Sequence, residues 1–238
     1  MKYFFISLFF IFLTATDTIY AQTKKQVESV SYICPEDTNV FSSYTAADAR
    51  KSSREENKNV LYVFTETIDD YFTEQKKNNH LFEGYTDSHP GMAAGDVATS
   101  IQSGTFPLGA MYLMSWYSDP VPFLLNGKKT GCSAFIVYTE SDKLWDYPRY
   151  KLIFISSEKV FTFDFLYSAS PEKLGKELPS YVLYEENGGM GAGWYWTDKK
   201  APERLYRDII MHHSGLPESV LNFQKDWEMI LTSIRIEK

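Results

Sequence analysis

A β-hairpin is predicted by residues 150–167, which read YKLIFISSEKVFTFDFLY. In the second half Phe161, Phe163 and Phe165 alternate with polar residues, the period of two that is typical of a strand with one buried face. The apolar run 150–156 precedes them, and a polar Ser-Glu-Lys segment separates the two halves. This stretch therefore predicts two adjacent strands joined by a short turn.

Two further hairpins are predicted on either side of this stretch. Upstream, the strands 121–125 and 133–139 flank an Asn-Gly turn signal at residues 126–127. Downstream, the strands 181–185 and 193–197 flank a glycine-rich loop that begins Asn-Gly-Gly. A short strand is also predicted near the amino terminus, and the Gly- and Pro-punctuated stretch 80–118 predicts a long loop with short helices.

Helices are predicted towards both ends of the chain. In residues 54–78 the apolar residues Val60, Phe64 and Ile68 recur at spacing four, which indicates an amphipathic helix. Two carboxyl-terminal helices are outlined by residues 202–215 and 217–234, each opening with a proline in its first turn. The fold class expected is α+β: an antiparallel sheet of hairpins packed against helices from both ends of the chain.

The last of these helices carries a continuous apolar stripe. Its apolar residues recur at spacing three and four, so we expect them to face the core with Trp227 as the anchor. The stripe consists of Val220, Phe223, Trp227, Ile230 and Ile234.

The first 21 residues have the features of a cleavable signal peptide. Lys2 precedes an apolar core that is shorter than the roughly 20 residues of a membrane-spanning helix, and polar residues end it early. Cleavage is expected after Ala21, with Ala15 as the alternative site. The mature chain 22–238 is then expected to be a single α+β domain, with two small domains sharing a core as the alternative. Its expected location is the periplasm or the cell exterior.

The charge of the chain restricts its partners. The formal net charge is −7, with Lys pairs scattered along the sequence instead of clustered. Such a balance argues against nucleic acid and anionic lipid as partners. No later segment is apolar enough to indicate integral membrane association, and no metal or cofactor motif is recognised. A protein partner is the class that we expect.

The two cysteines, Cys34 and Cys132, both belong to the predicted mature chain. Because exported proteins meet an oxidising environment, an even number of cysteines favours a Cys34–Cys132 disulfide. The alternative makes Cys132 a nucleophile within the tripeptide Gly-Cys-Ser.

Catalytic signatures are weak throughout the sequence. Asp208 and His212, four residues apart on a predicted helix, are expected to form a surface pair, and His89 lies in a turn-like Asp-Ser-His-Pro-Gly segment. A hydrolase that uses Cys132 or a serine with His89 or His212 is therefore retained as an alternative function. The glycine-rich loop at residues 188–193 leads into a strand and not a helix, so a flexible turn is favoured over a phosphate site.

The downstream hairpin is the candidate binding surface. Its strands bring an aromatic group and an acidic pair close to a glycine-rich tip, a combination that suits contact with a basic protein. The predicted contact residues are Tyr184, Glu185, Glu186, Trp194 and Trp196. Core packing is the alternative for the two tryptophans, and stacking on sugars in a carbohydrate- or envelope-binding module is a third possibility.

These observations lead to one functional expectation. An exported, acidic chain without a catalytic cluster has a profile similar to that of immunity proteins against secreted antibacterial effectors. We therefore expect a non-enzymatic inhibitor that binds and neutralises a secreted effector or an envelope-attacking enzyme.

Overall fold

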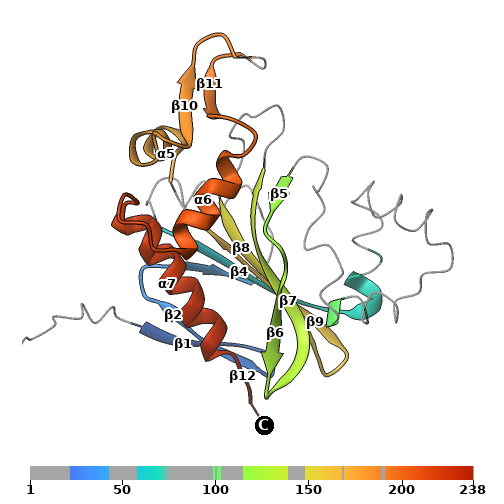
Figure 1. The fold of residues 1–238 in the computed structure, drawn as a ribbon. Coiled ribbons are helices and arrows are strands. Elements are labelled where there is room, and N and C mark those ends of the chain that lie inside the picture. Colours follow the sequence, from blue (N-terminus) through green and yellow to red (C-terminus); the bar gives the residue numbers. More distant parts are fainter. Residues whose placement is uncertain are drawn as a thin grey trace, which may run out of the picture.

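The computed structural model describes residues 22–42, 58–71, 73, 99, 101–102, 115–138, 148–167, 169–188 and 191–237. Within this part of the chain the fold is mixed α+β with mainly antiparallel sheets, as predicted (Figure 1). The predicted signal peptide 1–21, His89 and most of the predicted loop 80–118 lie outside the described residues.

A seven-stranded sheet forms the centre of the molecule (Figure 1). Strand β3 pairs with β4 in parallel, and the other neighbouring pairs are antiparallel. Two short strands, β5 and β6, share the outer side of the long strand β7. In spatial order the strands are β3 (Asn39–Phe41), β4 (Val60–Thr67), β9 (Lys159–Leu166), β8 (Arg149–Ser156), β7 (Lys128–Tyr138), then β5 (Ser115–Tyr117) and β6 (Val121–Leu125).

Ser118 joins the two short edge strands into one continuous edge. Its backbone N–H donates to the Phe135 carbonyl at 2.9 Å, and its side-chain Oγ accepts from the Phe135 N–H at 3.1 Å. The buried hydroxyl therefore replaces a ladder bond at the point where the edge strand is interrupted.

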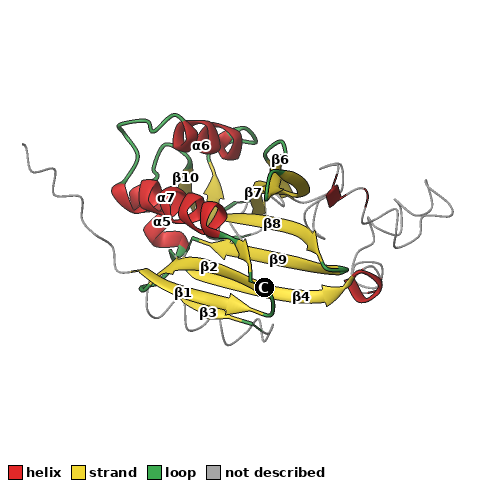
Figure 2. Cartoon of the chain, turned by 90° about the horizontal axis from the view of Figure 1, so that it is seen from below, coloured by secondary structure: helices red, strands yellow, loops and turns green. Residues whose placement is uncertain are grey.

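The other elements form two small sheets and three labelled helices. Strands β1 (Gln22–Val27), β2 (Val30–Pro35) and β12 (Arg235–Ile236) form one small sheet, and β10 (Val182–Glu185) pairs with β11 (Gly193–Trp196) in the other. The helices are α5 (Pro171–Glu177), α6 (Ala201–Ile210) and α7 (Glu218–Ser233), which Figures 1 and 2 show grouped together. No helix in the described part of the chain is long and apolar enough to cross a membrane.

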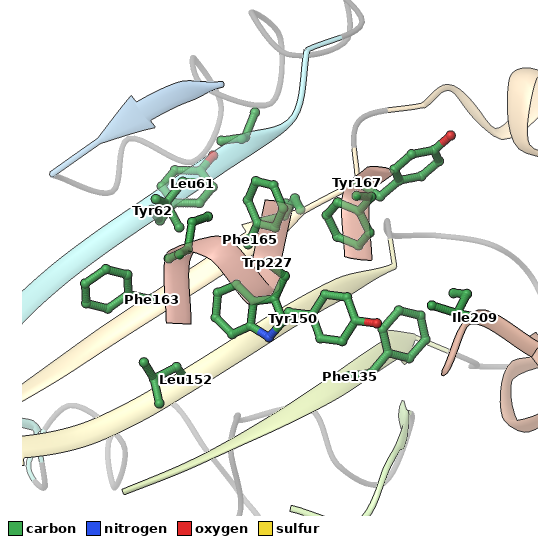
Figure 3. Close-up of a cluster of buried hydrophobic side chains, with 14 of the residues drawn as sticks. Leu61, Tyr62, Phe135, Tyr150, Leu152, Phe163, Phe165, Tyr167, Ile209 and Trp227 are labelled. Atoms are coloured by element: carbon green, nitrogen blue, oxygen red, sulfur yellow. The ribbon is translucent and has the colours of Figure 1, made fainter. Parts of the chain in front are cut away.

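Aromatic side chains fill the space between the seven-stranded sheet and α7 (Figure 3). Phe165 stacks on Phe223 with ring centroids 4.7 Å apart, and Tyr150 stacks on Trp227 at 5.5 Å. Tyr150 and Phe165 are register partners on adjacent strands, so the alternation seen in the sequence places them on one face of the sheet. We call this the helix-side face.

The opposite face of the sheet carries a second, smaller apolar cluster. Alternate residues of β7, β8 and β9 supply most of it. Its buried members are Tyr71, Ile101, Cys132, Ala134, Ile136, Ile153, Ile155 and Val160. Because both faces of the sheet are covered, its central strands carry buried apolar residues on both sides.

The helix predicted over residues 54–78 is wrong for most of the part that the structure describes. Residues 60–67 form strand β4, and only residues 68–71 and 73 are helical within the described part of this range. The first four residues of β4 are all buried, because the strand lies between β3 and β9 and is covered on both faces. A strand buried on both sides is apolar throughout, so a spacing of four also fits it. The described residues therefore do not confirm packing against helices from both ends of the chain, since α5, α6 and α7 all lie in its carboxyl-terminal part.

The two carboxyl-terminal helices are confirmed as α6 and α7. All five residues of the predicted stripe on the last helix are buried, and Trp227 is 2% exposed. Beside it Tyr150 donates a buried hydrogen bond from its hydroxyl to Gln224. The apolar period of this helix thus identifies the face that meets the sheet.

Replacing Trp227 by Ala should lower the free energy of unfolding by about 3 to 5 kcal/mol, because the cavity left in the aromatic layer cannot collapse. Lys225→Ala, on the exposed side of the same helix, should change it by less than about 0.5 kcal/mol. Denaturant titration measures both values. Equal, small effects of the two substitutions would contradict the packing described here.

A carboxylate on α7 is partly buried near the turn that follows β2. Burial raises the pKa of Asp226 to about 6, and the nearby carboxylate of Asp37 adds to the rise, while Lys225 opposes it. Since the folded state holds this proton more tightly than the unfolded chain, ionisation of Asp226 destabilises the fold. The stabilising contribution of the protonated Asp226 side chain is fully present below about pH 4. It is lost as the pH rises through about 6.

Asp226→Asn should therefore stabilise the protein by about 1 kcal/mol at pH 7.5, a figure discounted for partial exposure, and by much less at pH 4. The exposed Asp119→Asn provides the matched control and should change the stability by less than about 0.5 kcal/mol. Thermal unfolding at the two pH values measures the difference. A gain at pH 4 as large as that at pH 7.5 would show that the ionisation of Asp226 is not its source.

Candidate functional site

The β10–β11 hairpin extends away from the seven-stranded sheet (Figure 1). Its antiparallel register pairs Val182 with Trp196 at the base and Tyr184 with Trp194 nearer the tip. The connecting loop includes Gly191 at φ +87°, a left-handed conformation that glycine adopts without strain. The hairpin therefore combines a buried base with a loop whose backbone can turn sharply.

The base of the hairpin is held by the body of the protein. Val182 and Trp196 are buried members of the main core. Tyr181 donates a hydrogen bond to Asp208 of α6 at 2.5 Å. On the other side the Trp194 ring lies against Gly175 of α5, where an added Cβ would come within 1.9 Å of a ring atom. Two helices thus fix the direction in which the hairpin points.

The outer part of the hairpin carries an aromatic and acidic surface. Tyr184 is 52% exposed, one of the few large apolar side chains with that much exposure in the described part of the chain. Its ring meets the Trp194 ring edge to face, with centroids 5.3 Å apart. Glu185 and Glu186 follow directly and are exposed. We call Tyr184, Glu185, Glu186 and Trp194 the hairpin surface.

The structure changes the predicted role of one contact residue. Trp196 shares a strand face with Trp194, as the alternation predicts, but it is 3% exposed and packs in the main core. Its side chain cannot reach a partner, so the core alternative is correct for Trp196. Trp194 is half-buried against α5 and keeps part of its ring accessible.

The structure contains no Cys34–Cys132 disulfide, and both cysteines are free thiols in it. Cys34 belongs to the main core cluster on β2, whose Tyr32 meets Phe163 on the helix-side face, whereas Cys132 belongs to the cluster on the opposite face. The central sheet therefore separates the two sulfur atoms, a constraint that an even cysteine count cannot reveal.

Cys132 is also poorly suited to act as a nucleophile. It is fully buried, and burial raises the pKa of its thiol to about 11, an effect that Lys129 only partly offsets. Burial likewise raises the pKa of the Cys34 thiol to about 12. Because the thiolate is the reactive form, both groups resemble structural cysteines.

The predicted Asp208–His212 pair is not formed. Helix α6 ends at Ile210, and His212 lies beyond it with a left-handed φ of 48°. The Asp208 carboxylate instead accepts the Tyr181 hydrogen bond that holds the hairpin. Within the described residues, no group of three or more potential metal ligands is found.

One supporting element was not predicted from the sequence. Helix α5 begins with Ser170 as its cap, whose side chain accepts from the Lys173 N–H, and Pro171 occupies the first turn. This Ser-Pro-Glu start is a recognisable helix signal. The glycine at its centre, Gly175, gives no sign in the sequence that a tryptophan ring will pack on it.

Comparison with known proteins adds no functional assignment. No protein-family model matches the chain, and a search of curated proteins finds no significant match.

Both thiols should be protected in the native protein and react only after unfolding, because each is buried and has a raised pKa. Alkylation with iodoacetamide at pH 8, followed by intact-mass measurement, should show no rapid modification of the folded chain and two modifications in denaturant. An unreduced protein that takes up no alkylating agent even when unfolded would demonstrate a disulfide and contradict the arrangement of the two cysteines.

Proposed function

We propose that this protein is an exported, non-enzymatic binding protein that acts by stoichiometric contact with another protein. Its role is that of a periplasmic or extracellular immunity protein or inhibitor, which binds and neutralises a secreted antibacterial effector or an envelope-attacking enzyme. The hairpin surface is the centre of the contact. The observation that carries the proposal is the exposure of Tyr184 beside two carboxylates on a hairpin that two helices support.

The support at the base of the hairpin favours binding. A contact surface loses less conformational entropy on association when it is already held in position. Here Val182 and Trp196 anchor the hairpin in the core, and Gly175 allows close packing of Trp194 on α5. Tyr184 is thereby presented on a backbone whose direction is fixed in the free protein.

The chemistry of the surface favours a basic partner. Tyrosine and tryptophan are enriched among the residues that dominate binding energy, and the Tyr184 side chain is half exposed. Glu185 and Glu186 make no ion pair within the described part of the chain, so their charges are available to a partner. Together with the net charge of −7, they would accelerate encounter with a positively charged protein.

The test is capture of a partner from envelope extract by the full chain, followed by titration of the captured protein with variants. Tyr184→Ala should weaken binding by about 2 kcal/mol, roughly thirtyfold in Kd, because it removes an interface anchor. The matched control is Leu124→Ala, which truncates an equally exposed apolar side chain on β6 and should leave Kd unchanged.

Charge reversal separates the electrostatic contribution. Glu185→Lys with Glu186→Lys should slow association several-fold, and the effect should shrink at high salt. Asp119→Lys with Glu158→Lys makes the same charge change on other exposed loops and should have a smaller effect.

Normal binding by a folded Tyr184→Ala variant would remove the hairpin surface from the proposal. Turnover of a substrate by the purified chain, with no partner captured, would overturn the proposed function itself.

A further inference from the structure

The face of the central sheet opposite the helices carries a polar row within an apolar surface. Strand register aligns Ala134 of β7, Lys151 of β8, Asp164 of β9 and Tyr62 of β4. Lys151 and Asp164 are thus direct cross-strand neighbours, whose Cβ atoms lie about 5 Å apart in such a pair. Neither belongs to the hairpin surface or to the core on the helix-side face.

Asp164 is a buried carboxylate with one oxygen unused. The residue is 3% exposed, and its Oδ2 accepts a hydrogen bond from Arg149 Nη1 at 3.0 Å. Its Oδ1 is buried and has no hydrogen-bond partner. Buried carboxylate oxygens are nearly always hydrogen-bonded. Asp164 Oδ1 is therefore free to accept a hydrogen bond from a group outside the described residues.

Lys151 is the neighbour of that carboxylate and is an unusual lysine. Its side chain is partly exposed, yet the surrounding protein strips the amine of water and lowers its pKa. Arg149, two residues along the same strand, lowers the pKa further, while Asp164 and Glu66 of β4 oppose the effect. Apolar neighbours on the same face, Ile153 among them, account for the loss of water.

We propose that Lys151 is the nucleophilic amine of a second site, which binds a small molecule with an aldehyde or ketone group by forming an imine. A lysine that is desolvated and lies next to another cation is the type that proteins use for this chemistry. Asp164 Oδ1 is the proton acceptor of the site. The site lies apart from the hairpin surface and does not depend on the proposed partner.

The bond changes at this site are balanced without any further reagent. The Lys151 nitrogen attacks the carbonyl carbon, a C–N bond forms, and the carbonyl oxygen takes a proton to become a hydroxyl. The nitrogen gives up a proton to Asp164 Oδ1. Loss of the second nitrogen proton and protonation of the hydroxyl release one water molecule and leave a C=N bond.

The experiment is reductive trapping on the full chain with acetaldehyde and cyanoborohydride at pH 7, stopped at low conversion and mapped by peptide mass spectrometry. Lys151 should be modified several-fold faster than the exposed Lys128 and Lys225, since a lowered pKa leaves a larger fraction of the amine neutral at pH 7. This preference should shrink as the pH approaches 10, where ordinary lysines also lose their protons.

Lys151→Met is the matched variant and should abolish the fast phase while the exposed lysines react as before. If this variant does not fold, the pH profile of the unchanged protein still decides. Modification of Lys151 at the rate of the exposed lysines, or more slowly, would overturn the proposal. That outcome would leave the binding role of the hairpin surface untouched, because the titrations of the Tyr184 variant do not involve this face of the sheet.

Discussion

Aromatic stacking between α7 and the central sheet is the interaction on which the rest of the structure depends. Phe165 contacts both Phe223 and Trp227, and Tyr150 stacks on the same tryptophan. Tyr32 of β2 extends the layer by meeting Phe163 edge to face at 5.0 Å. One layer of rings therefore joins the large sheet, the carboxyl-terminal helix and the small amino-terminal sheet. Burial of such rings contributes more to the stability of the fold than any surface contact.

The same layer positions the hairpin surface through a short chain of contacts. Tyr167, which packs on Phe223, donates a hydrogen bond to Glu177 at the end of α5. Helix α5 then presents Gly175 to the Trp194 ring. The aromatic layer thus fixes α5, and α5 fixes the exposed strand. The direction of the hairpin is therefore set by packing elsewhere in the molecule, and the binding role proposed for it rests on that support.

The sequence predicted those elements whose pattern has only one structural meaning. Phe161, Phe163 and Phe165 alternate cleanly, and the stripe on α7 has the helical period, so both were recognised. Strand β4 was missed because burial on both faces erases its alternation. Trp196 was misplaced because alternation puts it on the same face as Trp194 but does not tell that the base of the hairpin enters the core while the tip stays exposed. An even cysteine count does not tell on which side of the sheet each thiol lies, and the environment of Asp164 arises only from the register of the strands.

Native-state hydrogen exchange of the full chain tests most directly whether the aromatic layer holds the hairpin. The account predicts that the backbone amides bonded between β10 and β11 exchange nearly as slowly as those of α7 and β9, because the base of the hairpin belongs to the same core. Exchange of the β10–β11 amides several orders of magnitude faster than that of α7 would show that the hairpin opens independently, and would contradict the account.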